Sequence, residues 1–302
     1  MDKDLSLMEF IKLFPDKQSC LSHIEKIRWA NGITCPFCGN IKIYNTNRGF
    51  KCSKCLKKFS HTVATIFDNS KMPLTTWFFL IYMEAVCKKN VSSHQVARNL
   101  NLHQAVAWRM QQKIRLSMKQ SESLKLSGVC EIDECFVSKG NKWTRWGGIS
   151  TRKTPIIGIV ERGGNVVIKA VEDRKRSTII EIVKQHVIEG STIYSDGNPV
   201  YQKLPQCYAH DFVEHSSHEY VREDVHTNNI ENVWSFFKKS VRNAHHSISA
   251  KHIQLYCDQT AFRYNNRKIT GYEKFNKMME LCMQGSIIFR NKDKSNTYYL
   301  QP

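Results

Sequence analysis

The sequence has few acidic side chains and no long apolar run, and both features limit the class of protein to which it can belong. Its 302 residues include 27 Asp and Glu against 45 Lys and Arg, a formal net charge of +18. The longest apolar stretch, residues 77–86, contains Glu84 and is too short to span a bilayer. The first ten residues lack the apolar segment of a secretory signal. We therefore expect an intracellular protein without a membrane partner.

The excess of positive charge is concentrated near the N-terminus. Residues 1–121 hold 19 Lys and Arg but 7 Asp and Glu, whereas residues 122–302 hold 26 and 20. Proteins this basic usually bind polyanions, because clustered cations attract phosphate groups over some distance. A basic surface that only maintains solubility is the alternative. We expect nucleic acid as the partner, contacted mainly by the N-terminal two-fifths of the chain.

The cysteines indicate a metal site. There are eleven, an odd number, and in a reducing compartment clustered cysteines indicate metal rather than disulfides. Four of them form two CxxC pairs, namely Cys35 and Cys38, then Cys52 and Cys55. Two such turns aim four thiolates at one point, which is the tetrahedral set of structural Zn²⁺. The paired spacing disfavours the alternative of four buried free thiols.

The segment between the two pairs is typical of a β-hairpin that turns at Asn47–Gly49, so residues 31–68 are predicted to form a zinc ribbon. Zinc ribbons bind DNA, bind protein or only stabilise a small fold. Basic side chains in this ribbon favour DNA, and they are Lys42, Arg48, Lys51, Lys54, Lys57 and Lys58.

Helical patterns flank the ribbon. Residues 5–29 are amphipathic and predict a helix within an N-terminal segment, 1–30. Residues 71–121 predict three more helices, at 74–88, 92–100 and 103–118.

The last two of these helices surround a tight turn at Asn101, which favours a helix-turn-helix-like DNA-binding module. On the second, Gln104, Arg109 and Lys113 lie outside the apolar stripe, where they suit base edges and phosphates. An ordinary helical hairpin is the alternative.

From residue 127 onward the pattern changes to strands. Strands are expected at 129–137, 155–161, 165–171 and 191–196, with a hairpin turn at the sequence RGGN. A helix at 178–188 is predicted to begin with a capping box of Thr178 and Glu181, and a long amphipathic helix starts near Thr227. Residues 127–272 therefore predict a mixed β-sheet with helices, while the tail, 273–302, gives little information. The whole chain is expected to be a multidomain α+β protein.

Three acids in this domain lie where such a fold brings side chains together. Asp133 is in the middle of a strand, Asp196 ends another, and Glu231 is in the first turns of the long helix. This order of elements fits a sheet of RNase H type, in which three carboxylates meet at one edge. Oxygen ligands of this kind suit Mg²⁺ or Mn²⁺. Two such ions about 4 Å apart activate a nucleophile and stabilise the leaving oxygen in phosphoryl transfer.

Each acid also has a simpler interpretation. Asp133 would be a solvated acid on an edge strand, Asp196 a turn former, and Glu231 a helix cap. Taken together with the order of elements, the metal site is the better interpretation. Lys238 lies two turns beyond Glu231 on the same helix face, where it suits a phosphate backbone. Glu131 and Glu134 remain unassigned.

Several motifs together resemble a known family. CPxCG and FKCxxC, then EIDE, YSDG and HTNNIENVWSFFKKSV, are similar to bacterial insertion-sequence DDE transposases of the zinc-ribbon class, the ISXO-like group related to the Merlin superfamily. The resemblance implies an RNase H-like catalytic domain. Its catalytic triad would be Asp133, Asp196 and Glu231, with Lys238 as an auxiliary basic residue.

The resemblance also implies what the protein does. Mg²⁺-dependent hydrolysis would cut DNA at the terminal inverted repeats of the element, and the freed 3′-hydroxyl would then attack target DNA. The partners would be double-stranded DNA and further copies of the chain in a synaptic complex, at least a dimer. The protein would be cytoplasmic and associated with the nucleoid if its source is bacterial. A DNA-binding regulator with an inactive RNase H-like domain and a nuclease without strand transfer are the alternatives.

Overall fold

The computed structural model describes residues 5–138, 142–143, 149–150, 153–214, 219, 221–245, 248–284, 286–290 and 297–301. The chain divides into two compact units. Unit 1 comprises residues 1–87, 91–118 and 269–302, and unit 2 comprises residues 88–90 and 119–268. Among the described residues, no helix combines the length and the apolar character that crossing a membrane requires.

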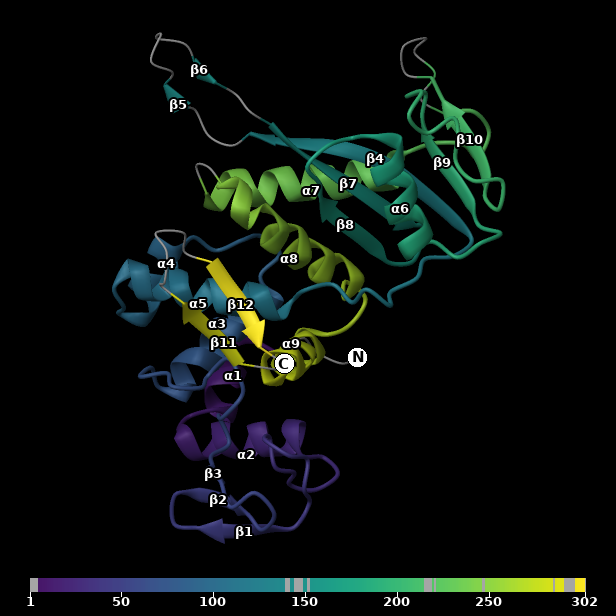
Figure 1. Ribbon diagram of the computed structural model, residues 1–302. Helices are drawn as coiled ribbons and strands as arrows, with labels where there is room; N and C mark the ends of the chain where they lie inside the picture. The colour runs from purple at the N-terminus through teal and green to yellow at the C-terminus, as the bar shows by residue number, and fades with distance from the viewer. Residues whose placement is uncertain are drawn as a thin grey trace. The chain divides into compact units, whose positions relative to one another are not determined.

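Unit 1 combines the ribbon with a group of helices (Figure 1). Its helices are α1 (Leu7–Leu13), α2 (Lys17–Arg28), α3 (Leu74–Val86), α4 (Ser93–Leu100), α5 (Gln104–Ser117) and α9 (Gly271–Met283). Its strands are β1 (Ile43–Thr46), β2 (Gly49–Cys52), β3 (Lys58–Phe59), β11 (Ser286–Arg290) and β12 (Thr297–Gln301). The strands β1, β2 and β3 form an antiparallel sheet in that order, which provides the predicted ribbon.

Helix α9 comes from the part of the chain whose sequence was uninformative, yet it supplies core side chains to unit 1. The Phe275 ring centroid lies 5.0 Å from that of Phe10 on α1 and 5.7 Å from that of Phe78 on α3. All three rings are buried. The segment after the predicted catalytic domain therefore folds back onto the N-terminal helices.

Two expectations about helix starts are wrong. Residues 5–29 form two helices instead of one, because Pro15 has no N–H to donate and the Asp16 carboxylate accepts from Ser19 N and caps α2. The helix expected at 178–188 is α6 (Arg176–His186), which begins earlier, so Thr178 is inside its first turn. The Thr178 hydroxyl donates to Asp173 instead of forming a capping box.

Unit 2 is built on a five-stranded mixed sheet in the order β10-β9-β4-β7-β8. Its strands are β4 (Val129–Ser138), β7 (Lys153–Glu161), β8 (Val166–Ala170), β9 (Thr192–Asp196) and β10 (Ala209–Val213), with short strands β5 (Lys142–Trp143) and β6 (Ile149–Ser150) pairing separately. β4, β7 and β8 are antiparallel, joined in part by the predicted RGGN turn, and β9 and β10 run parallel to β4. The expected mixed sheet with helices is confirmed, and the structure adds the strand order and the strand β10.

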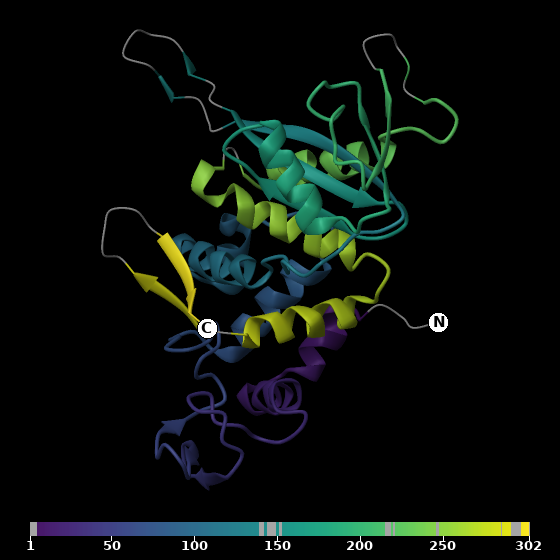
Figure 2. The same ribbon diagram turned by 45° about the vertical axis from the view of Figure 1, so that its right-hand side comes forward.

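Helices cover both faces of this sheet, as Figures 1 and 2 show. One face packs against α7 (Asn228–Ala244) and α8 (Ile253–Asn265), which follow one another across a 3₁₀ turn at Ala250–His252. The opposite face packs against α6. Because side chains alternate along a strand, β4 sends Ile132 toward α6 and Asp133 toward α7.

The outer edge of β8 is closed by side-chain amides. Gln120 accepts from Ile168 N and donates to Ile168 O, at 3.1 and 2.9 Å. Asn265 pairs in the same way with Val166, at 2.7 and 3.0 Å. Gln254 accepts from Ala170 N at 2.8 Å. These groups satisfy backbone donors and acceptors that an edge strand otherwise presents to solvent or to another chain.

Candidate functional site

The four ribbon thiols gather at one point, as the CxxC spacing predicts. All four sulfur atoms lie within 4.8 Å of one another, and the Cys35–Cys55 and Cys38–Cys52 pairs are each 3.6 Å apart. A Zn–S bond of about 2.3 Å places tetrahedral sulfurs roughly 3.8 Å apart, so the spacing suits zinc.

The backbone of the ribbon favours this convergence. Cys52 Sγ accepts from Asn40 Nδ2 and from the backbone N–H groups of Lys54 and Cys55, at 3.4–3.5 Å. Burial raises the pKa of the Cys52 thiol, but these donors outweigh it and bring the pKa down to about 6. Gly49 has φ of +129°, and a Cβ there would meet Phe59 O at 2.5 Å, so only glycine allows β2 and β3 to close.

The two aspartates face each other across neighbouring strands. The parallel pairing of β4 with β9 matches Val129 with Thr192 and Glu131 with Tyr194, a constant offset of 63 residues. The same offset joins Asp133 to Asp196, at the point where the two strands separate. Residues in register on parallel strands point to the same face, so both carboxylates lie on the α7 side.

Asp133 is mostly buried, and its environment opposes its negative charge. Burial raises the pKa of Asp133 to about 7, and the charges of Asp196 and Glu134 add to the effect. Trp234 Nε1 on α7 donates to Asp133 Oδ2 at 2.9 Å. The Trp234 ring lies over Gly158, the partner of Asp133 in β7, where a Cβ would come within 2.6 Å of the ring.

Glu231 and Lys238 extend the site along α7. Glu231 is exposed in the first turn, and its carboxylate accepts from the Thr227 hydroxyl at 3.0 Å. Lys238 is also exposed and lies beside the buried Cys135 thiol. Burial raises the pKa of this thiol, and the charge of Lys238 offsets only part of the increase. Cys135 is two residues beyond Asp133 on the same face of β4. The helix therefore runs along the face of the strand that carries Asp133.

The carboxylates fit a divalent cation by their chemistry. Two neighbouring carboxylates, one of which raises the pKa of the other, are the donor set that Mg²⁺ or Mn²⁺ neutralises. Within the described residues, the four cysteines alone bring three or more ligand atoms within 4.8 Å of one another. Glu231, whose carboxylate accepts from Thr227, is not brought to that spacing with Asp133 and Asp196.

Glu131, which the sequence left unassigned, connects β4 to the start of α7. Its carboxylate is fully buried and accepts from Asn229 N at 2.8 Å, Asn229 Nδ2 at 2.7 Å and Ile230 N at 3.1 Å. Arg162 Nε donates to the same group at 2.8 Å. An anion at a helix N-terminus satisfies unpaired N–H groups and is favoured by the helix dipole. Glu131 therefore fixes the turn of α7 that carries Glu231.

Glu134 makes the matching connection on the other face of β4. Its carboxylate accepts from Asn198 Nδ2 at 2.9 Å and from the buried Tyr201 hydroxyl, and it pairs with Arg174 at 2.9 Å. Asn198 and Tyr201 belong to the segment that follows Asp196. The two acids that flank Asp133 thus hold the chain segments of the other two acidic residues. Their partners are 31 to 99 residues away, so spacing along the chain gave no sign of them.

The predicted DNA contacts on α5 differ in how available they are. Gln104 Nε2 donates to Ser93 Oγ at 2.7 Å, which joins α5 to α4. Lys113 Nζ donates to Ile66 O at 3.2 Å, and burial lowers its pKa. Arg109 is exposed. DNA contact by these residues stays a prediction.

Comparisons with known proteins match the ribbon and the domain with the mixed sheet separately. Residues 125–265 match the ISXO2-like transposase domain, and residues 15–58 match the transposase zinc-ribbon domain. The chain is also similar to a protein described as an uncharacterized protein in transposable element ISH50 of Halobacterium salinarum. The two are 26% identical over 295 residues, which cover 90% of this chain and 99% of that protein.

Proposed function

Because the chain belongs to the ISXO2-like transposases of the zinc-ribbon class, we propose that it cuts the DNA ends of its own insertion sequence and joins them to target DNA. The observation that carries the proposal is the pair of carboxylates just beyond the last paired residues of β4 and β9, where Asp196 acts on the charge of Asp133 and α7 packs beside it. Pairing two ends requires more than one catalytic unit, so we expect a dimer or a higher multimer on DNA.

Asp133 and Asp196 would hold Mg²⁺, and Glu231 would complete the set after releasing Thr227. When bound there, divalent ions would polarise the phosphate and activate the attacking hydroxyl. Trp234 holds the Asp133 carboxylate in one orientation through its indole N–H. Lys238 would hold a phosphate of the bound strand beside the site, since its ammonium is exposed on the same helix.

Glu131 and Glu134 would act as positioning residues. Neither needs to touch DNA, because the first holds the N-terminus of α7 and the second holds the segment after Asp196. Catalysis by metal ions requires carboxylates placed within fractions of an ångström, so groups that orient the ligands contribute strongly.

The proposal is tested with duplexes that carry the DNA flanking the reading frame. With Mg²⁺, the wild-type protein should nick these ends and join pre-nicked ends to a plasmid, and Asp196→Asn should do neither. Binding of the ends without any nicking by the wild-type protein would support a regulator instead. Nicking without joining would support a nuclease of the same fold.

Glu131→Gln should lower end cleavage about 10- to 100-fold and raise the Mg²⁺ concentration needed for half-maximal rate. The amide that replaces one oxygen would turn a donor toward other donors at the start of α7, which displaces Glu231. The measurement is a Mg²⁺ titration of cleavage at saturating DNA, well below the melting temperature.

A matched control separates positioning from loss of stability. Ile179→Ala removes a buried side chain on α6, which packs on the opposite face of the sheet, and should cost about 2–5 kcal/mol. Its Mg²⁺ requirement should equal that of the wild type. If both variants shift the Mg²⁺ requirement alike, Glu131 has only a structural role.

A further inference from the structure

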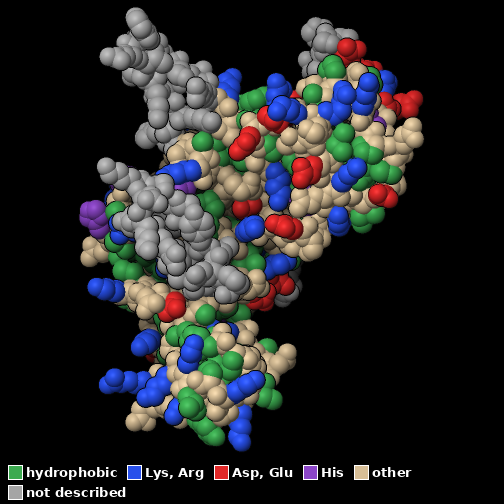
Figure 3. All heavy atoms as spheres, in the orientation of Figure 1, with side chains coloured by type: hydrophobic (Ala, Val, Ile, Leu, Met, Phe, Trp, Pro, Cys, Tyr) green, Lys and Arg blue, Asp and Glu red, His purple; other side chains and the backbone are tan. Residues whose placement is uncertain are grey.

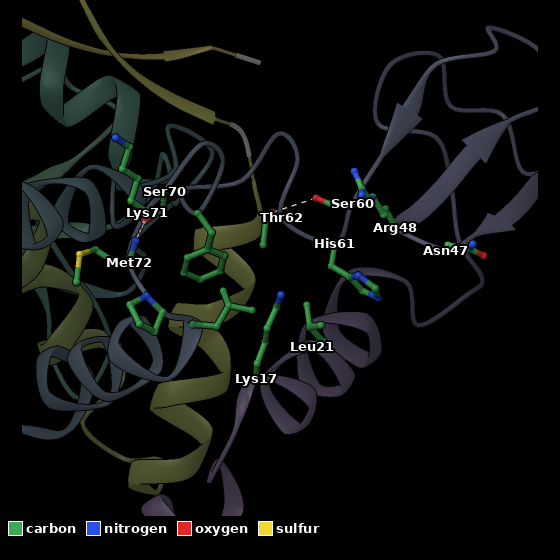
Figure 4. A pocket seen from close by; sticks show the side chains of 14 residues that line it. Lys17, Leu21, Asn47, Arg48, Ser60, His61, Thr62, Ser70, Lys71 and Met72 are labelled. Atoms are coloured by element: carbon green, nitrogen blue, oxygen red, sulfur yellow. Dashed lines mark hydrogen bonds between the residues drawn. The ribbon is translucent and has the colours of Figure 1, made fainter.

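A cleft with cationic side chains in its lining lies within unit 1, between the ribbon and the helices, and the proposed chemistry does not use it. Its volume is about 700 Å³. Three cationic side chains line it, each from a different segment: Lys17 from α2, Arg48 from the β1–β2 turn, and Lys71 from the loop before α3. Figure 4 shows Arg48 beside Ser60, Lys71 on the opposite side, and Lys17 reaching up between them.

The cationic side chains of this cleft have no acid beside them among the lining residues. The fourteen lining residues include no Asp or Glu, and residues 26–67 contain none at all. In the described part of the chain, Lys17, Arg48 and Lys71 form no ion pair. Figure 3 shows Lys and Arg side chains spread over the ribbon. Three cations that line one cleft, with no acid among the lining residues, favour an anionic ligand.

The acids nearest in sequence do not line the cleft, although Glu25 contacts the lining residue His61. Asp16 caps α2, and Glu25 contacts His61 at 3.3 Å. Asp68 accepts from Ala64 N, and its charge acts on Arg28 and Lys113. None of them is among the groups that line the cleft.

The remaining lining groups match a sugar–phosphate strand. Asn47 and Thr62 carry side chains that donate hydrogen bonds to phosphate oxygens, while Leu21 and Pro73 offer apolar surface to deoxyribose. The cleft contains no cluster of carboxylates or thiols that would hold a metal. A polyanion with apolar spacers between its charges is the chemistry that fits.

We propose that this cleft binds the sugar–phosphate backbone of double-stranded DNA, with Lys17, Arg48 and Lys71 each contacting phosphate. The inference rests on the proposed function, since it names the part of unit 1 that holds the DNA. Backbone contacts of this kind fix the position of a protein on the duplex, while base recognition comes from other side chains. DNA in the cleft contacts the ribbon and the α2 and α3 segments at once.

The test compares two triple variants that lose the same charge. The cleft variant combines Lys17→Ala, Arg48→Ala and Lys71→Ala. The control combines Lys12→Ala, Lys26→Ala and Lys277→Ala, three exposed lysines of unit 1 that do not line the cleft. Binding of a fluorescent duplex of the flanking DNA, and of a scrambled duplex, is measured from about 50 to 300 mM salt.

Each lost phosphate contact should lower the slope of log affinity against log salt by about 0.9, so the cleft variant should lose about 2 to 3. Its affinity should fall at least about tenfold for both duplexes, because backbone contacts carry no sequence information. The control should lose less than about 1 in slope. Equal slopes for the two variants would overturn the proposal.

A second measurement uses the unaltered protein and so avoids any folding defect. Bound duplex should slow acetylation of Lys17 and Lys71, followed by mass spectrometry, but not of Lys12 and Lys277. Equal rates with and without DNA at all four lysines would also overturn the proposal. These results are independent of catalysis. If the wild-type protein fails to nick DNA, the proposed function is refuted. If it nicks DNA normally but the cleft lysines are not protected, only the proposal for the cleft is refuted.

Discussion

Asp133→Asn is expected to lower end cleavage by at least about a thousandfold while leaving binding of the ends unchanged. The substitution keeps the size of the side chain and an oxygen to accept from Trp234, but it removes the charge that would hold a divalent cation. Cleavage and binding are measured on the same duplex at saturating Mg²⁺. Cleavage within tenfold of the wild-type rate would remove Asp133 from the active site.

The same variant should be more stable than the wild type at alkaline pH. The folded-state pKa of Asp133 is raised to about 7, against about 3.9 in an unfolded chain. The folded protein therefore holds this proton more tightly, and stability is lost as the pH rises from about 4 to about 7. Asparagine does not ionise, so it avoids a cost on the order of 2–4 kcal/mol above that range.

Thermal unfolding without divalent metal should show this gain for Asp133→Asn at pH 8 and little difference near pH 4. Added Mg²⁺ should stabilise the wild type and narrow the gap at pH 8, because a ligand that binds only the folded state raises its stability. A variant that melts below the wild type at pH 8 without metal would contradict the electrostatic account of this site.

Cys52→Ser should reduce the zinc content of the purified chain from about one ion to nearly none. The hydroxyl is a poor zinc ligand at neutral pH. The Cys52 sulfur also accepts three hydrogen bonds, which orient it toward the other thiols. Zinc binding in such modules contributes roughly 10–16 kcal/mol to folding, far more than the small core around Trp29, Phe50 and Phe59 supplies. The ribbon should unfold, and DNA binding should fall with it.

Metal analysis after gel filtration and limited proteolysis of residues 31–60 measure these effects. Cys207→Ser is the matched control, since it removes an exposed thiol of unit 2. It should keep its zinc and its resistance to protease. Full zinc retention in Cys52→Ser would refute the assignment of the four-thiolate site.

The sequence predicted those parts of the molecule in which short-range spacing determines the geometry. Two CxxC turns bring thiols together within 21 residues, counted from Cys35 to Cys55. Four of the five strands in the sheet of unit 2 also followed from local patterns, because alternating apolar residues and the RGGN turn indicate β4, β7, β8 and β9, whereas the strand order and β10 come from the structure.

Long-range partners were beyond such reasoning. Glu131 and Asp133 share one face of β4, so the pattern of the strand does not distinguish them. Only the tertiary structure shows that Glu131 binds the N-terminus of α7 and that Asp133 lies beside Asp196. Lys113 is polar and on a basic helix, yet it is drawn inward by the Ile66 carbonyl. Helix α9 is buried through its contacts with α1 and α3, which no pattern within its own residues encodes.

The amide-covered edge of β8 restricts how copies of the chain can assemble. A strand from a second molecule can add to a sheet only where backbone N–H and C=O groups are open. At β8 such a strand would first have to displace Gln120, Gln254 and Asn265, each of which pairs with the backbone. Multimers on DNA must therefore form through side-chain surfaces or through other elements. Folded chains also lack, on this side of the sheet, the template on which fibrous aggregates grow.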